Sequence, residues 1–256
     1  MSTLFALFNK EWMEQARTGK VMLLGIVFIL LGIMNPAIAK LTPWMLEMMA
    51  ESLEESGMSI TAVTVDAMTS WQQFFKNLPI GLIVFVLIQS GCFTAEYQRG
   101  TLIPVVTRGV ARYKIVTAKA AMLMIFWSVC YWVCFGITYA YNAYFWDNTV
   151  VKNLLFSTLL WWLFGLMIVA ALVFFSTLLR TSSGVLLGAA AVWYLPYAFA
   201  FLPKVSKYLP TALADGMPLI SGTTDPGEYV GALLITCALT IAFLVISYPL
   251  MNQKQL

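Results

Sequence analysis

Long apolar stretches, separated by short polar segments, divide this chain of 256 residues. A helix that crosses a membrane needs about 20 mostly apolar residues, and stretches of roughly this length occur six times. The even number places both ends of the chain on the same side of the membrane. The pattern therefore predicts an all-α integral membrane protein with six transmembrane helices. The predicted spans cover residues 21–39, 78–95, 115–145, 154–179, 184–203 and 229–249.

Composition and charge agree with this fold class. Hydrophobic residues make up 61% of the chain and charged residues 11%, so the charges are too few to solvate a globular surface. Basic residues are retained on the cytoplasmic face, and most of the 15 lie on the side of the termini. Both termini are therefore predicted to be cytoplasmic. The basic residues predicted to lie outside are Lys40, Lys76, Lys152, Lys204 and Lys207.

Residues 1–20 predict a separate helix before the first span. Apolar side chains, Phe8 and Trp12 among them, recur at helical spacing, and charged ones such as Arg17 lie on the opposite face. This pattern is typical of an amphipathic interfacial helix that lies along the membrane surface. The alternative is that the segment only anchors the chain.

Two longer segments are predicted to lie outside. In residues 40–77, Trp44 and several methionines alternate with acids, which favours one or two amphipathic surface helices with a break at Ser56 and Gly57. Residues 204–228 contain prolines and apolar stretches too short to span the membrane, which favours a short re-entrant or surface helix.

The segment 96–114 concentrates charge between the second and third spans. A basic element on the cytoplasmic side can dock on a soluble partner through charge-assisted contacts, so we expect a cytoplasmic coupling helix here. Gly100 is predicted to allow a tight bend, and Thr101 to cap the helix that follows. The alternative is that the basic side chains only hold the loop inside and contact anionic lipid. The segment begins Glu96-Tyr97-Gln98-Arg99-Gly100-Thr101-Leu102, and Arg108, Arg112, Lys114 and Lys119 follow.

Several kinds of site are missing from the sequence. No stretch matches the glycine-rich phosphate-binding loop, so the chain is not expected to bind ATP by that device. The chain has no histidine, which argues against histidine-based catalysis and against a metal site, and its four cysteines fall inside spans as packing groups. No span carries an acid in its central turns, which disfavours an ion-driven carrier. An intramembrane enzyme is disfavoured as well, because no paired acids or activated nucleophile are visible.

The stretch from Glu96 to Leu102, followed by basic residues and Lys119, resembles the signature of ABC-2 type transporter permeases. In that family a Glu-x-x-x-Gly-Thr-Leu motif precedes a basic residue and a lysine. The amino-terminal helix, the six spans and the two outer loops are also similar to the family along essentially the whole chain. One departure is Ile103-Pro104-Val105-Val106, where the family often has a longer leucine-rich stretch.

The resemblance implies that residues 1–256 form one membrane domain, the permease subunit of an ABC exporter in a bacterial plasma membrane. It implies no catalysis and no cofactor on this chain, with ATP and magnesium bound by a separate ATP-binding subunit present in two copies. The other implied partners are the lipid bilayer and a second copy of the permease or a paralogue, with no nucleic acid. The residues implied to couple to the ATP-binding subunit are Glu96, Arg99, Gly100, Thr101, Leu102, Arg108 and Arg112.

The fifth span supplies a candidate contact face and part of a candidate cavity. The spacing of Gly184 and Gly188 lets helices approach closely, either within the chain or between two subunits. Similar permeases line a cavity from spans two and five, where this chain offers mainly aromatic residues, although each of these could instead pack against helices or lipid. The candidate cavity residues are Phe85, Gln89, Phe93, Trp193, Tyr194, Tyr197 and Phe201.

Such a cavity suits a lipophilic or amphipathic cargo. We expect a peptide toxin or antimicrobial peptide, with small lipophilic antibiotics as the next candidate. The alternative function is a membrane scaffold or immunity protein that transports nothing.

Overall fold

A computed structural model describes residues 3–54, 66–200 and 203–254, which are almost entirely helical. Short helices join the long ones at both ends of the molecule. The long helices are α1 (Thr3–Arg17), α2 (Lys20–Glu54), α3 (Ala67–Gln89), α6 (Arg112–Phe145), α7 (Leu154–Leu178), α8 (Ser182–Phe199) and α11 (Val230–Gln253). The short ones are α4 (Thr94–Arg99), α5 (Ile103–Thr107), η1 (Asn148–Val150), α9 (Pro203–Ser206), η2 (Pro210–Ala214), α10 (Met217–Ile220) and η3 (Pro226–Tyr229).

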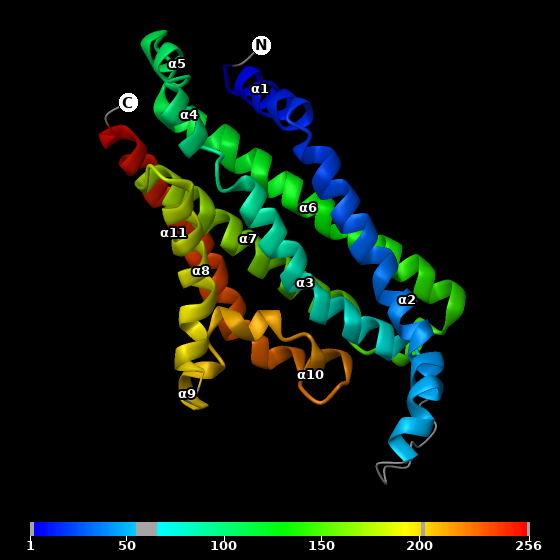
Figure 1. Ribbon diagram of the computed structural model, residues 1–256. Coiled ribbons are helices and arrows are strands. Elements are labelled where there is room, and N and C mark those ends of the chain that lie inside the picture. The colour runs from blue at the N-terminus through cyan, green and yellow to red at the C-terminus, as the bar shows by residue number, and fades with distance from the viewer. Residues whose placement is uncertain (1–2, 55–65, 201–202, 255–256) are drawn as a thin grey trace.

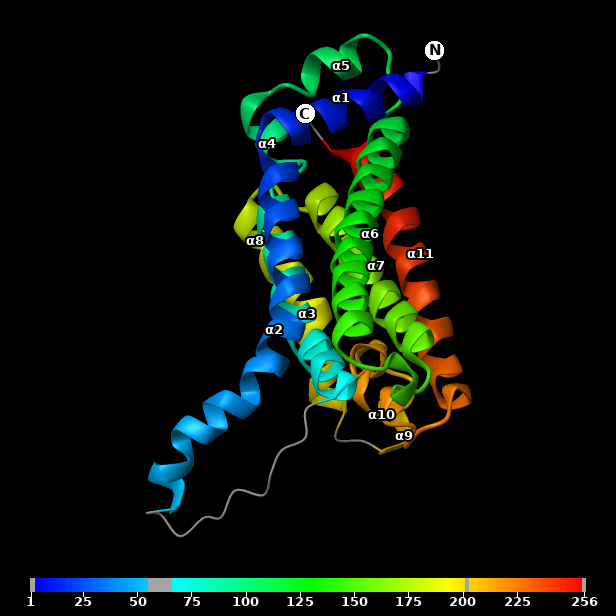
Figure 2. The same cartoon turned by 90° about the vertical axis from the view of Figure 1, so that its right-hand side faces the viewer.

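Within the described residues, six helices are long and apolar enough to cross a membrane, as the hydrophobic pattern predicted. They run side by side as a bundle (Figure 1). Helix α1 lies crosswise over one end of the bundle, where α4, α5 and both ends of the chain also gather (Figure 2). The short helices α9 and α10 lie at the other end. That the end with the termini is cytoplasmic stays a prediction.

The segment between the first two spans is helical where the structure describes it, in keeping with the helices predicted in residues 40–77. Helix α2 extends far into this range, and α3 begins well before its end. The place of the segment outside the membrane stays a prediction. The last part of α2 projects beyond the bundle (Figure 2). Helix α3 begins early because the side chain of Asp66 accepts a hydrogen bond from the N–H of Thr69, at 3.1 Å, and so caps the helix. The predicted break at Ser56 and Gly57 lies outside the described residues.

Pro36, near the end of the predicted first span 21–39, lies inside α2. Because proline has no N–H, the carbonyl of Gly32, one turn earlier, loses its partner within the helix. The hydroxyl of Thr138, on α6, donates to this carbonyl at 3.0 Å. A neighbouring helix thus replaces the missing hydrogen bond, which allows α2 to continue past the proline.

The core of the bundle is held by aromatic packing around Trp127, on α6. This side chain is fully buried and contacts the rings of Phe28, Phe85 and Trp161, which lie on three other helices. It also covers Gly165 on α7 so closely that no side chain would fit there. Helix association in a membrane depends on such close packing, since lipid is as apolar as the helices themselves.

The segment 204–228 folds into short helices, in keeping with the short helix predicted there, and η2 and α10 lie against α7. Two side chains of α7 hold it in place. The indole N–H of Trp161 donates to the carbonyl of Ala214 at 3.0 Å, and the hydroxyl of Ser157 donates to the carbonyl of Gly216 at 3.3 Å. This end of the bundle is therefore closed by ordered structure that is anchored to the central helix.

Thiol labelling tests which end of the bundle is cytoplasmic. Thr107→Cys and Gly227→Cys each place a thiol at an exposed position, at opposite ends of the bundle. Because basic residues are retained inside, we expect a membrane-impermeant maleimide to label Gly227→Cys in intact cells and Thr107→Cys only after permeabilisation. The unsubstituted chain is the control, since its own cysteines are buried or half-buried. The opposite pattern would invert the predicted topology.

Candidate functional site

The candidate site is the short segment between α3 and α6, at the end of the bundle that α1 covers. Gly100 ends α4 with a φ of 66°, a left-handed conformation that is unfavourable for other residues. The predicted bend at Gly100 is confirmed. The predicted cap by Thr101 is wrong: α5 begins after Leu102, and no described side chain caps it. Pro104, in its first turn, removes one of the N–H groups that a cap would satisfy.

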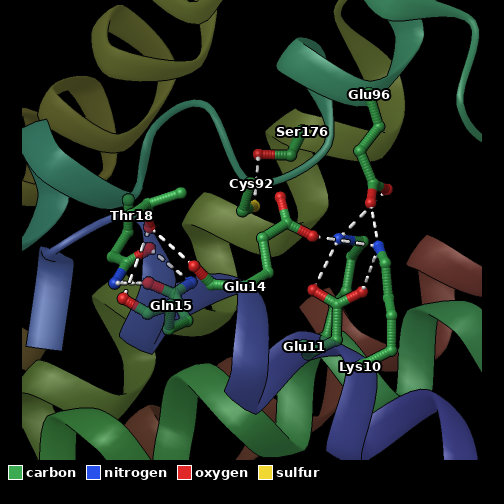
Figure 3. Close-up of polar contacts among 10 residues, drawn as sticks. Lys10, Glu11, Glu14, Gln15, Thr18, Cys92, Glu96 and Ser176 are labelled. Atoms are coloured by element: carbon green, nitrogen blue, oxygen red, sulfur yellow. Dashed lines mark hydrogen bonds and ion pairs between the residues drawn. The ribbon is translucent and has the colours of Figure 1, made fainter.

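A group of charged side chains joins α4 to α1 and α6 (Figure 3). Glu11, Glu96 and Lys119 are buried, whereas Lys10 and Glu14 are partly exposed. The ammonium of Lys119, on α6, lies 2.7 Å from Oε2 of Glu11, on α1, and 3.1 Å from Oε2 of Glu96, on α4. The side chain of Lys119 is only 2% exposed. Lys10 also pairs with Glu96, and with Glu11 and Glu14 at 3.0 Å each. One set of ion pairs, which we call the charged network, therefore joins three helices that are distant in the sequence.

Removing one charge from the charged network is energetically unfavourable, because its buried partners would then lack a counter-charge. A buried charge loses its hydration and needs close partners, which the two ammonium groups and three carboxylates provide for one another. Burial alone would lower the pKa of Lys10, but Glu11 and Glu96 outweigh it and raise this pKa. Burial would raise the pKa of Glu14, yet its hydrogen bond to Lys10 lowers it. Both groups therefore stay charged at neutral pH.

The same carboxylates also form a candidate metal site, because they lie close together. Oxygens of Glu11, Glu14 and Glu96 lie within 4.8 Å of one another, a spacing that can hold a cation. The ammonium groups of Lys10 and Lys119 already lie among them. Since these groups supply the positive charge, we assign the cluster to ion pairing between helices.

A pair of amides joins α1 to α3 beside the charged network. Gln15 and Gln89 are both buried, and each donates its Nε2 to the Oε1 of the other at 3.0 Å. The polar face of α1 thus meets the bundle, whereas Trp12 is 47% exposed. Phe8 is half-buried and Arg17 is exposed. Contact of the exposed apolar side chains with lipid stays a prediction.

Two further contacts attach α4 to α8 and α11. The hydroxyl of Thr94 lies 2.6 Å from that of Ser182, in the first turn of α8. The hydroxyl of Tyr97 donates to Sδ of Met251, near the end of α11, at 3.3 Å. With Glu96, three side chains of this short helix therefore contact α1, α6, α8 and α11.

The residues predicted to meet the ATP-binding subunit divide into an exposed and an internal set. Glu96 and Leu102 are buried, and Arg112 donates Nη1 to three carbonyl oxygens at the end of α11, at distances between 2.7 and 3.0 Å. These side chains point inward because each one has a partner within the chain. Glu96 pairs with ammonium groups, and Leu102 packs against core side chains. Arg112 binds the helix-end carbonyls that have no partner within α11. The exposed set is Arg99, Thr101 and Arg108.

Comparison with known proteins agrees with this arrangement of six spans and a tethered basic segment. A sequence model described as ABC-2 family transporter protein matches residues 5–256. The chain belongs to the ABC-2 transporter family. It is 21% identical to YxlG, an uncharacterised transmembrane protein of Bacillus subtilis (strain 168), over 248 residues that cover 96% of this chain and 95% of that protein. The resemblance stated on the sequence motif is confirmed, and the chain is a multi-pass bacterial membrane protein whose family works with an ATP-binding partner.

The predicted cavity residues of this ABC-2 permease do not lie together. Phe85, Gln89 and Phe93 are completely buried in the core, where Phe85 packs against Trp127 and Gln89 pairs with Gln15. These three residues therefore cannot line an open cavity. Trp193 and Tyr194 do line an apolar groove, Tyr197 is exposed further along α8, and Phe201 lies outside the described residues.

This groove has a volume of about 230 Å³ and lies between α3, α7 and α8. Its other walls are aliphatic. The lining residues besides Trp193 and Tyr194 are Ile83, Val86, Leu87, Ile168, Leu186, Ala189 and Ala190. The α3 side of the groove is therefore formed by residues that the sequence did not single out, because their aliphatic side chains look like any other part of a span.

The two glycines of α8 make contacts within the chain. A Cβ at Gly188 would lie 2.5 Å from ring atoms of Phe175, on α7. Gly184 lies beside Thr181 and Leu179, in the turn that joins α7 to α8. Of the two predicted roles, the contact within the chain is the one that the structure describes.

The sequence pattern singled out Lys119 but not its pairing with Glu11. A signal for it exists, because Lys119 lies inside the predicted span 115–145 and a charge within a span usually has a specific partner. What the sequence lacks is the identity of that partner. Glu11 is 108 residues away, on the charged face of the amino-terminal helix.

Replacing Lys119 tests the charged network. We expect Lys119→Met to lower the free energy of unfolding by about 3–5 kcal/mol, because Glu11 and Glu96 would stay buried without a counter-charge. Denaturant unfolding of the purified permease in detergent measures this loss. Adding Glu11→Gln to Lys119→Met should restore part of it. Lys114→Met, in the first turn of the same helix, is the matched control, and an equal effect of the two single variants would contradict the assignment.

Proposed function

We propose that this chain is the membrane-spanning permease of an ATP-driven exporter and is moved by separate ATP-binding subunits. The observation that supports this most directly is the attachment of α4 to four other helices through Thr94, Glu96 and Tyr97. Arg99, in the last turn of α4, and Arg108, at the end of α5, are both exposed. A partner that binds the exposed residues would therefore act on the bundle through ion pairs and hydrogen bonds, without needing a large interface.

The partner surface would consist of α4 and α5. Charge-assisted hydrogen bonds from Arg99 and Arg108 to acids of the ATP-binding subunit would contribute about 1.5 to 3 kcal/mol each when desolvated. Ile103, which is 47% exposed, would add an apolar contact between them. Two ATP-binding subunits, one for each permease chain, would hold the ATP and magnesium. Their closure on ATP would then displace α4.

A complete transporter would need a second copy of this chain or a paralogue. Helix α8 buries only Val185, Ala189 and Trp193 within its own chain. Its other side carries large apolar side chains, among them Leu187 at 72% exposure. Pairing two chains through this side would enclose the groove between α3, α7 and α8, and turn two surface grooves into one pathway.

The chemistry of the groove favours a lipophilic or amphipathic cargo. Aliphatic and aromatic side chains line it, and Trp193 and Tyr194 are the lining residues whose side chains also carry a polar group. Binding sites for small or peptide ligands commonly combine an apolar lining with few polar groups. We therefore propose export of an amphipathic peptide, such as a toxin or antimicrobial peptide, or of another lipophilic compound.

Charge reversal tests the docking surface. We expect Arg99→Glu combined with Arg108→Glu to abolish co-purification with the ATP-binding subunit, because it replaces two attractive contacts by repulsive ones. Membrane insertion and the thermal unfolding midpoint should stay unchanged, since both side chains are exposed. Lys76→Glu, an exposed charge reversal on α3 at the other end of the bundle, is the matched control. Undiminished co-purification of the double variant would refute docking on this surface.

ATP hydrolysis by the purified complex tests the cargo. In nanodiscs, a synthetic amphipathic helical peptide should raise the ATPase rate several-fold, whereas a scrambled peptide without an apolar face should not. Leu186→Glu would place a charge in the groove and should remove the stimulation while basal hydrolysis continues. If no ATP-binding subunit associates with the wild-type chain at all, the non-transporting scaffold becomes the better assignment.

A further inference from the structure

The end of α11 makes a second connection to α4 that shares no residue with the charged network. The ammonium of Lys254 donates to the carbonyl oxygens of Thr177 and Leu179, at the end of α7, at 2.8 and 2.9 Å. It also lies over the ring of Tyr97, on α4, at 4.0 Å from the centroid. One side chain therefore contacts both the partner-facing element and the central helix of the bundle.

The end of α11 is itself held by α6. Arg112 donates Nη1 to the carbonyl oxygens of Met251, Asn252 and Lys254. The last carbonyls of a helix have no partner within it and form its negative end, so a basic side chain stabilises them. The same rule explains Lys254 at the end of α7. Arg112 of α6 thus caps α11, and Lys254 that follows α11 caps α7.

A pocket of about 150 Å³ lies between the α4–α5 segment and the turn after α7, and Gly100, Ile103, Arg180 and Lys254 are among the residues that line it. Burial and the nearby Arg180 lower the pKa of Lys254 to about 8, so the side chain is still mostly protonated at neutral pH. The contact to Tyr97 is therefore that of a cation over an aromatic ring.

We infer that Lys254 is a positioning residue, which holds α4 against the end of α7 through the ring of Tyr97. A displacement of α4 then reaches the α7–α8 hairpin, and with it two walls of the apolar groove. The contact itself stands independently, whereas its role in transport rests on the proposed function. The charged network carries displacement of α4 to α1 and α6, and Lys254 carries it to the groove.

The native Cys92 reports whether α4 is held. It lies in the turn between α3 and α4, is buried, and donates its thiol to Oγ of Ser176 on α7 at 3.6 Å (Figure 3). If Lys254 holds α4 against α7, Lys254→Met should make Cys92 react about tenfold faster with a maleimide, as expected when one charge-assisted contact is lost. Mass spectrometry of the purified permease in detergent resolves the reaction at this site. Tyr97→Leu should have the same effect.

Conservative and matched variants separate positioning from general damage. Lys254→Arg keeps the cation and should restore slow labelling. Lys114→Met removes a positive charge at the same end of the bundle and should leave Cys92 protected. Unchanged Cys92 labelling in both Lys254→Met and Tyr97→Leu would overturn the positioning role. Equal acceleration in Lys114→Met would overturn it as well.

The role in transport is measured on the complex with the ATP-binding subunit. Lys254→Met should leave co-purification and the KM for ATP unchanged but remove the stimulation of ATP hydrolysis by the permease, and Lys254→Arg should restore it. Full stimulation in Lys254→Met, despite fast Cys92 labelling, would overturn the transport role. If the wild-type chain binds no ATP-binding subunit, the proposed function fails, while the labelling of Cys92 still decides whether Lys254 positions α4.

Discussion

One lysine ammonium, buried between carboxylates from two other helices, determines how this end of the bundle is built. Lys119 lies within a membrane-spanning helix, where a lone charge is strongly unfavourable. Glu11 and Glu96 must therefore approach it, and both do so within 3.1 Å. This requirement places α1 crosswise over the bundle with its polar face inward, and it fixes the start of the segment that would meet a partner.

The short helix α4 depends on these contacts more than a longer helix would. Its six residues are far too few for a helix that is stable alone. Its conformation is instead fixed by Gly100 at one end and by tethers from Thr94, Glu96 and Tyr97. An element that owes its shape to tertiary contacts responds to force by changing those contacts. This property suits an element that connects an ATP-binding subunit to a membrane bundle. The neighbouring helices define both the resting position of α4 and its displaced position.

The spans and the family could be read from the sequence, whereas the pairing of distant residues could not. Lipid requires long apolar stretches, so the six spans follow from the hydrophobic pattern alone, and the motif from Glu96 to Leu102 indicated the family. The boundaries of α2 could not be predicted, because its continuation past Pro36 depends on Thr138 of another helix. The orientation of Glu96 could not be predicted either. A carboxylate beside Arg99 looks partner-facing until the ammonium of Lys119 is placed next to it.

The aromatic residues of this chain illustrate the same limit, and they bear on where cargo can bind. Phe85 and Tyr194 look alike in the sequence, yet one fills the core and the other lines a groove. What separates them is the position of α8, which lies at the edge of the bundle and buries few of its side chains. Exposure to lipid alone says little about function, since lipid accepts apolar surfaces at no cost. A groove is different, because lipid chains fill it poorly and its walls belong to helices that can separate. Two of its three walls lie on the α7–α8 hairpin, so any movement that reaches this hairpin also changes the groove.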